Sequence, residues 1–167
     1  MNSRLYLPGF TYTAEVVSPD GRVVDTFEVG NLIPQQAIDY VVSTLDGSGS
    51  VIPNWYVGIF KNDYVPVSST ASGDLPSVVG EAVGYSEATR PAWNPVYDNF
   101  SRLDNSAAVA EFSLTQNVML YGAFIVSGAT KGGGTGTLLS IARFPSPKDL
   151  ESGSTFRIRA GIDVVAG

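Results

Sequence analysis

The sequence predicts a mainly β protein, folded as an antiparallel β-sandwich or jelly-roll-like arrangement of about eight strands with one short α-helix. Its 18 glycines and 10 prolines indicate many turns rather than long helices. Short runs of β-branched and aromatic residues recur between those turns. Strands and helices do not alternate as they do in a parallel sheet, so two packed antiparallel sheets in one domain are expected.

The first predicted elements are a hairpin and a helix. Residues 11–29 contain two alternating runs around the turn sequence PDG, which is typical of a hairpin. The segment of about 34–46 is predicted to be the helix, because Pro34 fits a first turn and Gly47 suits the stop. Its apolar residues form one stripe: Ile38, Val41, Val42 and Leu45. We expect this stripe to cover part of a sheet.

Six strand-like runs follow the helix. They span 54–61, 80–85, 107–114, 118–127, 136–144 and 155–165. The last run alternates most plainly, which predicts one face in the core and one in solvent. The predicted core face consists of Phe156, Ile158, Ala160, Ile162 and Val164, and the opposite face carries Arg157, Arg159 and Asp163.

The segment 127–140, SGATKGGGTGTLLS, combines five glycines with Lys131 and raises the question of a phosphate-binding loop. Such a loop has the lysine directly after its last glycine and lies between a strand and a helix. Here the lysine precedes the glycine run and a β-like stretch follows. Glycines at a hairpin tip allow positive φ without steric cost, so we predict a turn.

The charge and composition exclude several functions. The chain has a net charge of −6, and its ten basic residues are scattered, so binding of nucleic acid through a basic face is not expected. It contains no cysteine and no histidine, which removes disulfides, sites built on those ligands and imidazole bases. No stretch approaches the ~20 apolar residues of a membrane span, and the start has no signal-peptide pattern. We expect synthesis in a cytosol and no membrane partner.

Candidate chemistry is sparse. Glu81 and Glu111 lie inside apolar runs and are the carboxylates best suited to an acid–base pair. Carboxylates on strand edges are more commonly solvated charges. Calcium-loop spacing and an S-x-x-K nucleophile motif are missing from the sequence. The sequence therefore predicts no enzyme, catalytic residue, metal, cofactor or small-molecule substrate.

Two long segments, 62–79 and 86–106, have no assigned element and are therefore candidate binding loops. Their aromatic residues are Tyr64, Trp93, Tyr97 and Phe100. Aromatic side chains often anchor interfaces, because they bury a large area at low entropic cost. Two interpretations remain open: these rings contact a partner, or they close the end of this protein's own sandwich.

The first ten residues precede the predicted hairpin and are interpreted as an N-terminal arm or extension, with a single β-sandwich domain at 11–167. Their apolar content comes from Leu5, Tyr6, Leu7 and Phe10. An arm of this kind would lie on a neighbouring molecule. The alternative is a frayed terminus, as is common at chain ends.

The order of segments resembles a known family. NLIPQQAIDYVV, WYVGIFKNDYVPV, GYSEATRPAWNP, DNSAAVAEFSL, VMLYGAFIVSG, GTLLSIARFP and GSTFRIRAGIDVV follow one another across residues 30–165. This succession resembles small accessory structural proteins of tailed bacteriophages, and within that group it is most similar to capsid decoration (cement) proteins.

The resemblance implies a virion protein on the capsid exterior that binds the major capsid protein and bridges capsomers. It also implies association with itself, as a dimer or trimer, which fits the closed symmetry of most homo-oligomers. The alternative is a tail- or fibre-associated module whose aromatic loops contact host glycans, with Trp93 as the expected contact. A carboxylate hydrolase that uses Glu81 or Glu111 is a third hypothesis.

Overall fold

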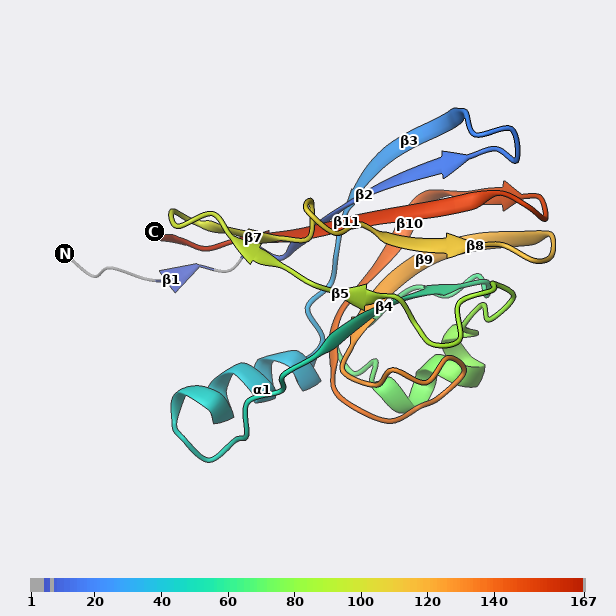
Figure 1. Ribbon diagram of the computed structural model, residues 1–167. Helices are drawn as coiled ribbons and strands as arrows, with labels where there is room; N and C mark the ends of the chain where they lie inside the picture. The colour runs from blue at the N-terminus through green and yellow to red at the C-terminus, as the bar shows by residue number, and fades with distance from the viewer. Residues whose placement is uncertain (1–4, 7, 167) are drawn as a thin grey trace.

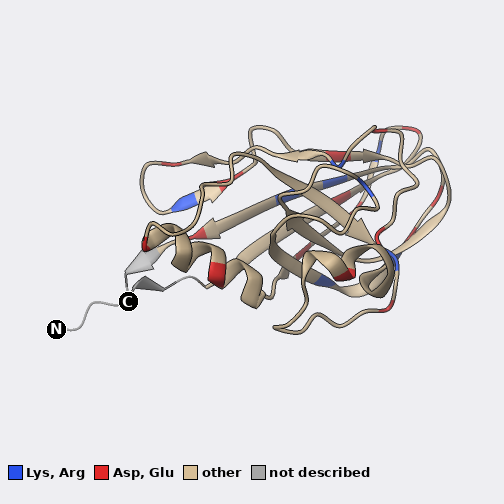
Figure 2. Ribbon diagram, turned by 90° about the horizontal axis from the view of Figure 1, so that it is seen from below, with Lys and Arg blue, Asp and Glu red and all other residues tan. Residues whose placement is uncertain are grey.

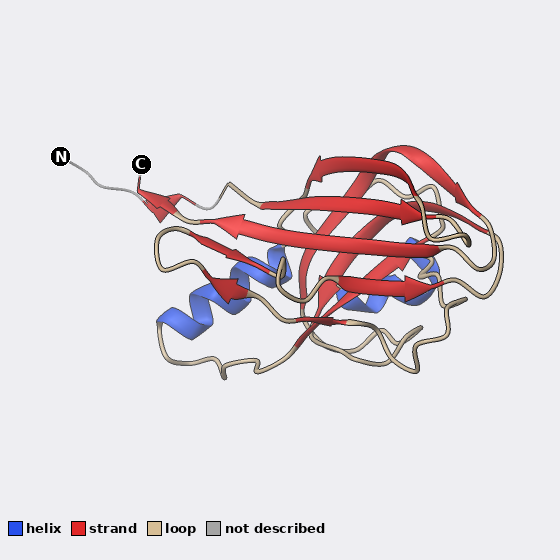
Figure 3. Ribbon diagram, turned by 45° about the horizontal axis from the view of Figure 1, so that its top comes forward, coloured by secondary structure: helices blue, strands red, loops and turns tan. Residues whose placement is uncertain are grey.

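The computed structural model describes residues 5–6 and 8–166 and confirms a mainly β, antiparallel, sandwich-like fold (Figures 1 and 3). The larger sheet has the order β3 (Val23–Gly30), β2 (Phe10–Val17), β11 (Thr155–Asp163), β7 (Arg102–Asp104) and β6 (Val96–Tyr97). A further strand, β8 (Ala110–Ser113), pairs with the other half of β11. The smaller sheet has the order β10 (Leu138–Leu150), β9 (Val118–Val126), β4 (Trp55–Phe60) and β5 (Ala92–Trp93).

The two ends of the described chain meet in a separate ribbon. The backbone of β1 (Leu5–Tyr6) pairs antiparallel with β12 (Val165–Ala166). Phe10, the last residue of the predicted arm, belongs to β2 and lies in the core.

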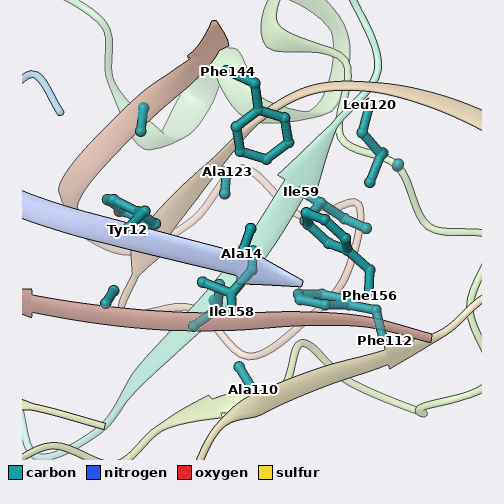
Figure 4. Packing of buried hydrophobic residues seen from close by; sticks show 14 of the residues in the cluster. Tyr12, Ala14, Ile59, Ala110, Phe112, Leu120, Ala123, Phe144, Phe156 and Ile158 are labelled. Atoms are coloured by element: carbon teal, nitrogen blue, oxygen red, sulfur yellow. The ribbon is translucent and has the colours of Figure 1, made fainter. Parts of the chain in front are cut away.

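The main core lies between the facing sides of the two sheets, and Figure 4 shows it from close by. The larger sheet contributes the inward positions of β2 and β11, and the smaller sheet those of β4 and β9. Its fully buried members include Tyr12, Phe112, Phe156, Ile158, Ile59 and Ala123. In the larger sheet, aromatic and β-branched side chains at alternate positions bury the inner face, which is the pattern that predicted strands.

Strand β11 confirms the predicted alternation but does not stay buried along its length. Phe156, Ile158 and Ala160 are completely buried. Ile162 is half-buried, and Val164, just beyond the strand, is 40% exposed. The apolar face of the larger sheet therefore continues past the region that the smaller sheet covers.

The segment 62–79 covers the outer face of the smaller sheet. It contains a 3-10 turn, η1 (Ser72–Asp74), and a π-helical turn, η2 (Leu75–Val79). Leu75 and Val79 pack with Phe60 and Phe124 in a second buried cluster. The smaller sheet is thus buried on both faces, and this long segment is part of the packed structure rather than a free loop.

The prediction of a strand at 80–85 is wrong. Glu81 and Tyr85 form only isolated bridges, to Phe60 and to Leu114 respectively. The apolar side chains of Ala82 and Tyr85 are buried in the main core, as strand residues would be. Burial of these side chains produces the same sequence pattern as a strand, although no ladder forms around them.

The predicted helix is present as α1 (Gln35–Leu45). Pro34 is the N-cap residue with an extended backbone, one position before the first turn in which the sequence placed it. Gly47, with φ of +77°, follows the last turn as predicted. Within the described part of the chain, no helix has the length and apolar character needed to cross a membrane. In Figure 1, α1 lies at the same end of the molecule as β7 and the two chain ends.

The glycine-rich segment connects β9 to β10 and is a turn, as predicted. A buried ion pair holds it: the Arg90 Nε and Nη2 atoms donate to the two carboxylate oxygens of Glu81 at 2.8 and 2.6 Å. Arg90 also donates to the carbonyl oxygens of Gly128 and Gly133, and Glu81 accepts the N–H of Gly132. The buried charges of Glu81 and Arg90 are therefore paired with each other and also bind backbone groups of the turn.

Lys131, the candidate phosphate ligand, binds protein carbonyls instead. Its Nζ donates to the carbonyl oxygens of Tyr85 and Glu87 at 2.8 and 2.7 Å, and it lies 4.5 Å from the centre of the Tyr85 ring. The lysine therefore fastens the turn to the segment that precedes Arg90.

Glu81→Gln is expected to lower the free energy of unfolding by about 3–5 kcal/mol, because it leaves the buried guanidinium of Arg90 without a countercharge. This loss corresponds to a Tm roughly 10 °C lower. The matched control is Glu111→Gln, which breaks the exposed pair with Arg157 and is expected to cost at most about 1 kcal/mol. Thermal and urea unfolding measure both, and equal losses at the two positions would contradict this role of the buried pair.

Candidate functional site: an apolar cleft at one end of the sandwich

An open apolar cleft of about 750 Å³ lies between α1 and the end of the larger sheet. Its floor contains Phe10 and Trp93, whose rings meet edge to face at 5.6 Å. The Trp93 indole nitrogen donates to the carbonyl oxygen of Ala160 at 3.0 Å, which fixes the ring. The cleft therefore has a rigid floor that belongs to the core.

The sheet wall is a row of apolar side chains that crosses four strands. The antiparallel registers align Phe10 of β2 with Ile162 of β11, Ile162 with Leu103 of β7, and Leu103 with Tyr97 of β6. Directly paired residues point to the same face of a sheet, so these four side chains share the face toward α1. Exposure rises along the row, from 5% at Phe10 to 51% at Tyr97.

The helix wall is the apolar stripe that the sequence predicted as a cover for the sheet. Only Ala37 is buried, whereas Ile38, Val42 and Leu45 line the cleft and remain exposed, with Leu45 at 79%. The helix therefore lies over part of the sheet, as expected, but a cleft separates much of its apolar stripe from the strands.

A rigid hairpin forms the rim beside Tyr97. The turn between β6 and β7 places Asn99 in the left-handed region at φ of +65°, and the carboxylate of Asp98 accepts the backbone N–H groups of Phe100, Ser101 and Arg102 at 2.8–2.9 Å. This turn carries Phe100, which is 85% exposed.

The hairpin is also tied to the rest of the sheet. Arg102 donates to Asp104 and to Asp163 of β11, and the N–H of Val164 donates to the carbonyl oxygen of Ser101. The exposed ring of Phe100 is therefore presented by a fixed backbone next to Val164, which itself lines the cleft.

Hydrogen bonds to the carboxylates of Asp98 and Asp104 determine the pH range over which these residues stabilise the hairpin. The backbone N–H groups of Arg102 and Phe100 hold the pKa of Asp98 below its usual value. Hydrogen bonds from Ser106, and then from Arg102, lower the pKa of Asp104 to about 2. Because both pKa values are lower in the folded state, the stabilisation is complete above about pH 4 and is lost as the pH falls through the folded-state values.

The structure separates the predicted contact residues into groups. Phe10 and Trp93 are only 5% and 4% exposed and pack in the main core, where they form the floor of the cleft. Tyr64 is half-buried against the second cluster, and its hydroxyl bonds Thr70. Tyr97 of β6 and Phe100 in the turn that follows it are exposed.

The predicted arm residues lie at the edge of the described chain. Leu5 and Tyr6 form β1, and their backbone pairs with the same chain. Leu7 lies outside the described residues, so the hypothesis that it contacts a neighbour stays a prediction.

The two candidate carboxylates do not form a pair with each other. Glu81 is bound by Arg90 and Gly132, and Glu111 pairs across the strands with Arg157. Over residues 5–6 and 8–166, no group of three or more acidic side chains is arranged to hold a metal ion.

Sequence reasoning missed Leu103 and Ile162 as parts of a surface site. Both read as ordinary strand residues, and only the register between β7 and β11 brings them together below α1. The apolar stripe of α1 was the available signal, although the stripe alone does not show how much of it the sheet covers.

The fold and the cleft define a mainly β, sandwich-like domain with an open apolar end. Comparison with protein families, with curated proteins and with solved structures gives no significant match.

Asp98→Ala is expected to loosen the hairpin that carries Phe100, because three backbone N–H groups lose their acceptor. Amide hydrogen exchange of Phe100, Ser101 and Arg102 should become several-fold faster at pH 7, and Asp98→Asn, which retains one oxygen acceptor, should have an intermediate effect. Asp20→Asn in the β2–β3 turn is the control and should leave these amides unchanged. Unchanged exchange in Asp98→Ala would contradict the proposed support of the turn.

Proposed function

We propose that this chain is a virion structural protein that decorates and stabilises a bacteriophage capsid from outside by binding the major capsid protein and bridging capsomers. The observation that carries the proposal is the open apolar end, which a single copy leaves uncovered. A cleft lined by exposed apolar side chains is typical of sites that contact another macromolecule. The segment order over residues 30–165, which resembles that of decoration proteins, supports the assignment to a capsid.

The fold suits a protein that acts by binding a partner over a large surface. Both faces of the smaller sheet are packed, and the long connection from β9 to β10 is held by the buried Glu81–Arg90 pair. A rigid body of this kind loses little conformational entropy when it binds. Several contacts of modest strength then act together through their effective concentration on a repeating shell.

The chain's charges are consistent with a protein partner. Acidic and basic residues are spread over strands and loops rather than gathered on one face (Figure 2). With a net charge of −6, the chain has no general attraction for a polyanion. We therefore propose the protein shell, and not the packaged nucleic acid, as the partner.

A tail- or fibre-associated module that binds glycans is the second candidate. It is favoured by the exposed rings of Tyr97 and Phe100, which could stack on a sugar, whereas the buried Trp93 is unsuited to that role. On this alternative, saccharide binding would depend on Tyr97 and Phe100 rather than on Trp93.

Capsid decoration predicts that purified virions contain the chain in fixed proportion to the major capsid protein, at hundreds of copies. Quantitative gel analysis of virions measures this ratio. Particles made without the chain are expected to release DNA at a lower temperature, and added protein should restore the normal release temperature. A few copies per particle with unchanged head stability would contradict decoration and favour the tail or fibre assignment.

A further inference from the structure

A second cleft, called the polar cleft below, lies at the end of the sandwich opposite α1. It is formed by the connections from β2 to β3, from β8 to β9 and from β10 to β11, and Figure 1 shows all three at that end. Its volume of about 380 Å³ lies within the range of about 300–1,000 Å³ that is typical of ligand pockets. Of the residues that the structure describes, none lines both this cleft and the apolar cleft below α1.

Two carboxylates of the polar cleft lack a countercharge. Asp149 near the end of β10 and Glu151 directly after the strand both line it. Over residues 5–6 and 8–166, neither side chain takes part in an ion pair. Lys148, the basic residue nearest to them in sequence, is already paired with Asp25 of β3 at 2.8 Å. The cleft therefore carries negative charge that a cationic ligand would neutralise.

A buried hydroxyl faces the same cleft. Ser154 lines it and is only 3% exposed, yet its hydroxyl makes no hydrogen bond to any other residue in the described part of the chain. Its backbone is fixed, because its N–H donates to the carbonyl oxygen of Glu151 and its own carbonyl oxygen accepts the N–H of Leu114. Side-chain polar groups that are buried to this extent normally have a partner. Next to two carboxylates that only accept hydrogen bonds, the free oxygen of Ser154 indicates a ligand that donates them.

Apolar side chains complete the wall of the polar cleft. Val16 and Leu150 are buried behind it, and Val24 is 59% exposed at its side. A long cationic side chain packs its aliphatic stem along apolar surface of this kind while its charged head binds oxygen atoms. A calcium ion suits the cleft less well, because it requires about six to eight oxygen ligands. The described residues contain no group of three or more acidic side chains that could supply most of them.

We propose that the polar cleft binds an alkylammonium group on an aliphatic stem, the chemistry that a lysine side chain of a protein and a free diamine share. Asp149 and Glu151 supply the countercharge, and the hydroxyl oxygen of Ser154 accepts one of the three N–H groups of the ammonium. The stem lies against Val16 and Leu150. This site is independent of the proposed capsid decoration, which depends on the apolar cleft at the other end of the molecule.

Two-dimensional NMR titration of the full chain with Nα-acetyl-lysine methylamide at pH 7 tests this inference. The amide signals of residues 149–154 should shift and saturate with a Kd on the order of 1 mM, as expected for a ligand of this size. The norleucine derivative, which has the same stem without the ammonium group, should cause no saturable shift.

Variants of the lining residues test the assigned contacts. Asp149→Asn and Glu151→Gln should each raise the Kd at least threefold, and Ser154→Ala should raise it about twofold or more because an acceptor is lost. Asp39→Asn removes the same charge from α1 at the opposite end, and this matched control should bind like the parent chain. The dispersion of the amide signals shows whether each variant is folded, and Glu151→Gln, at an exposed position, keeps the test open if another variant is not.

Titration with 1,5-diaminopentane distinguishes the two sources of the ligand. Weaker binding than that of the lysine derivative assigns the cleft to a lysine side chain of a protein partner, and tighter binding assigns it to a free diamine. The proposal is overturned if neither compound shifts residues 149–154 at about 20 mM, well above the expected Kd. Equal binding of the norleucine derivative, unchanged affinity in both carboxylate variants, or calcium chloride that shifts the same amides at lower concentration would also overturn it.

Discussion

The open end exists because the apolar face of the larger sheet is longer than the smaller sheet that covers it. Along β11 the side chains change from complete burial at Phe156 and Ala160 to partial exposure at Ile162 and Val164. Trp93 and α1 close only part of the remaining length. The alternating apolar residues of β11 therefore contribute to both the core and the open end. A shift in that alternation would change both surfaces together.

Charged side chains hold two irregular segments in place: the glycine-rich turn and the hairpin that carries Phe100. The Glu81–Arg90 pair and Lys131 hold the glycine-rich turn through hydrogen bonds to its backbone and to the segment beside it. Asp98 does the same for the hairpin of Phe100 with a single carboxylate. In each case a charged group satisfies several backbone donors or acceptors, and the chain gains a defined shape without regular secondary structure.

Local signals were sufficient to predict much of the fold. The hairpin of β2 and β3, the bounds of α1, the alternation of β11 and the turn at 127–140 all depend on residues close together in sequence. The false strand at 80–85 shows where this fails, because tertiary contacts of Tyr85 and the Arg90 partner of Glu81 decide its conformation. The candidate site was harder to predict than the fold. An aromatic residue looks the same in sequence whether it becomes core, like Trp93, or surface, like Phe100. The helix stripe, likewise, gave no sign of how much sheet lay beneath it.

The most direct measurement is the solvent accessibility of the cleft mouth in the protein as it normally occurs. The chain contains no cysteine, so Leu45→Cys and Val67→Cys each give a single labelling site. Rates of thiol modification, normalised to those of the unfolded chain, should show strong protection at position 45 and little at 67 on purified virions. Fast labelling at both positions would show that the apolar end stays uncovered, and would contradict its role as a contact surface.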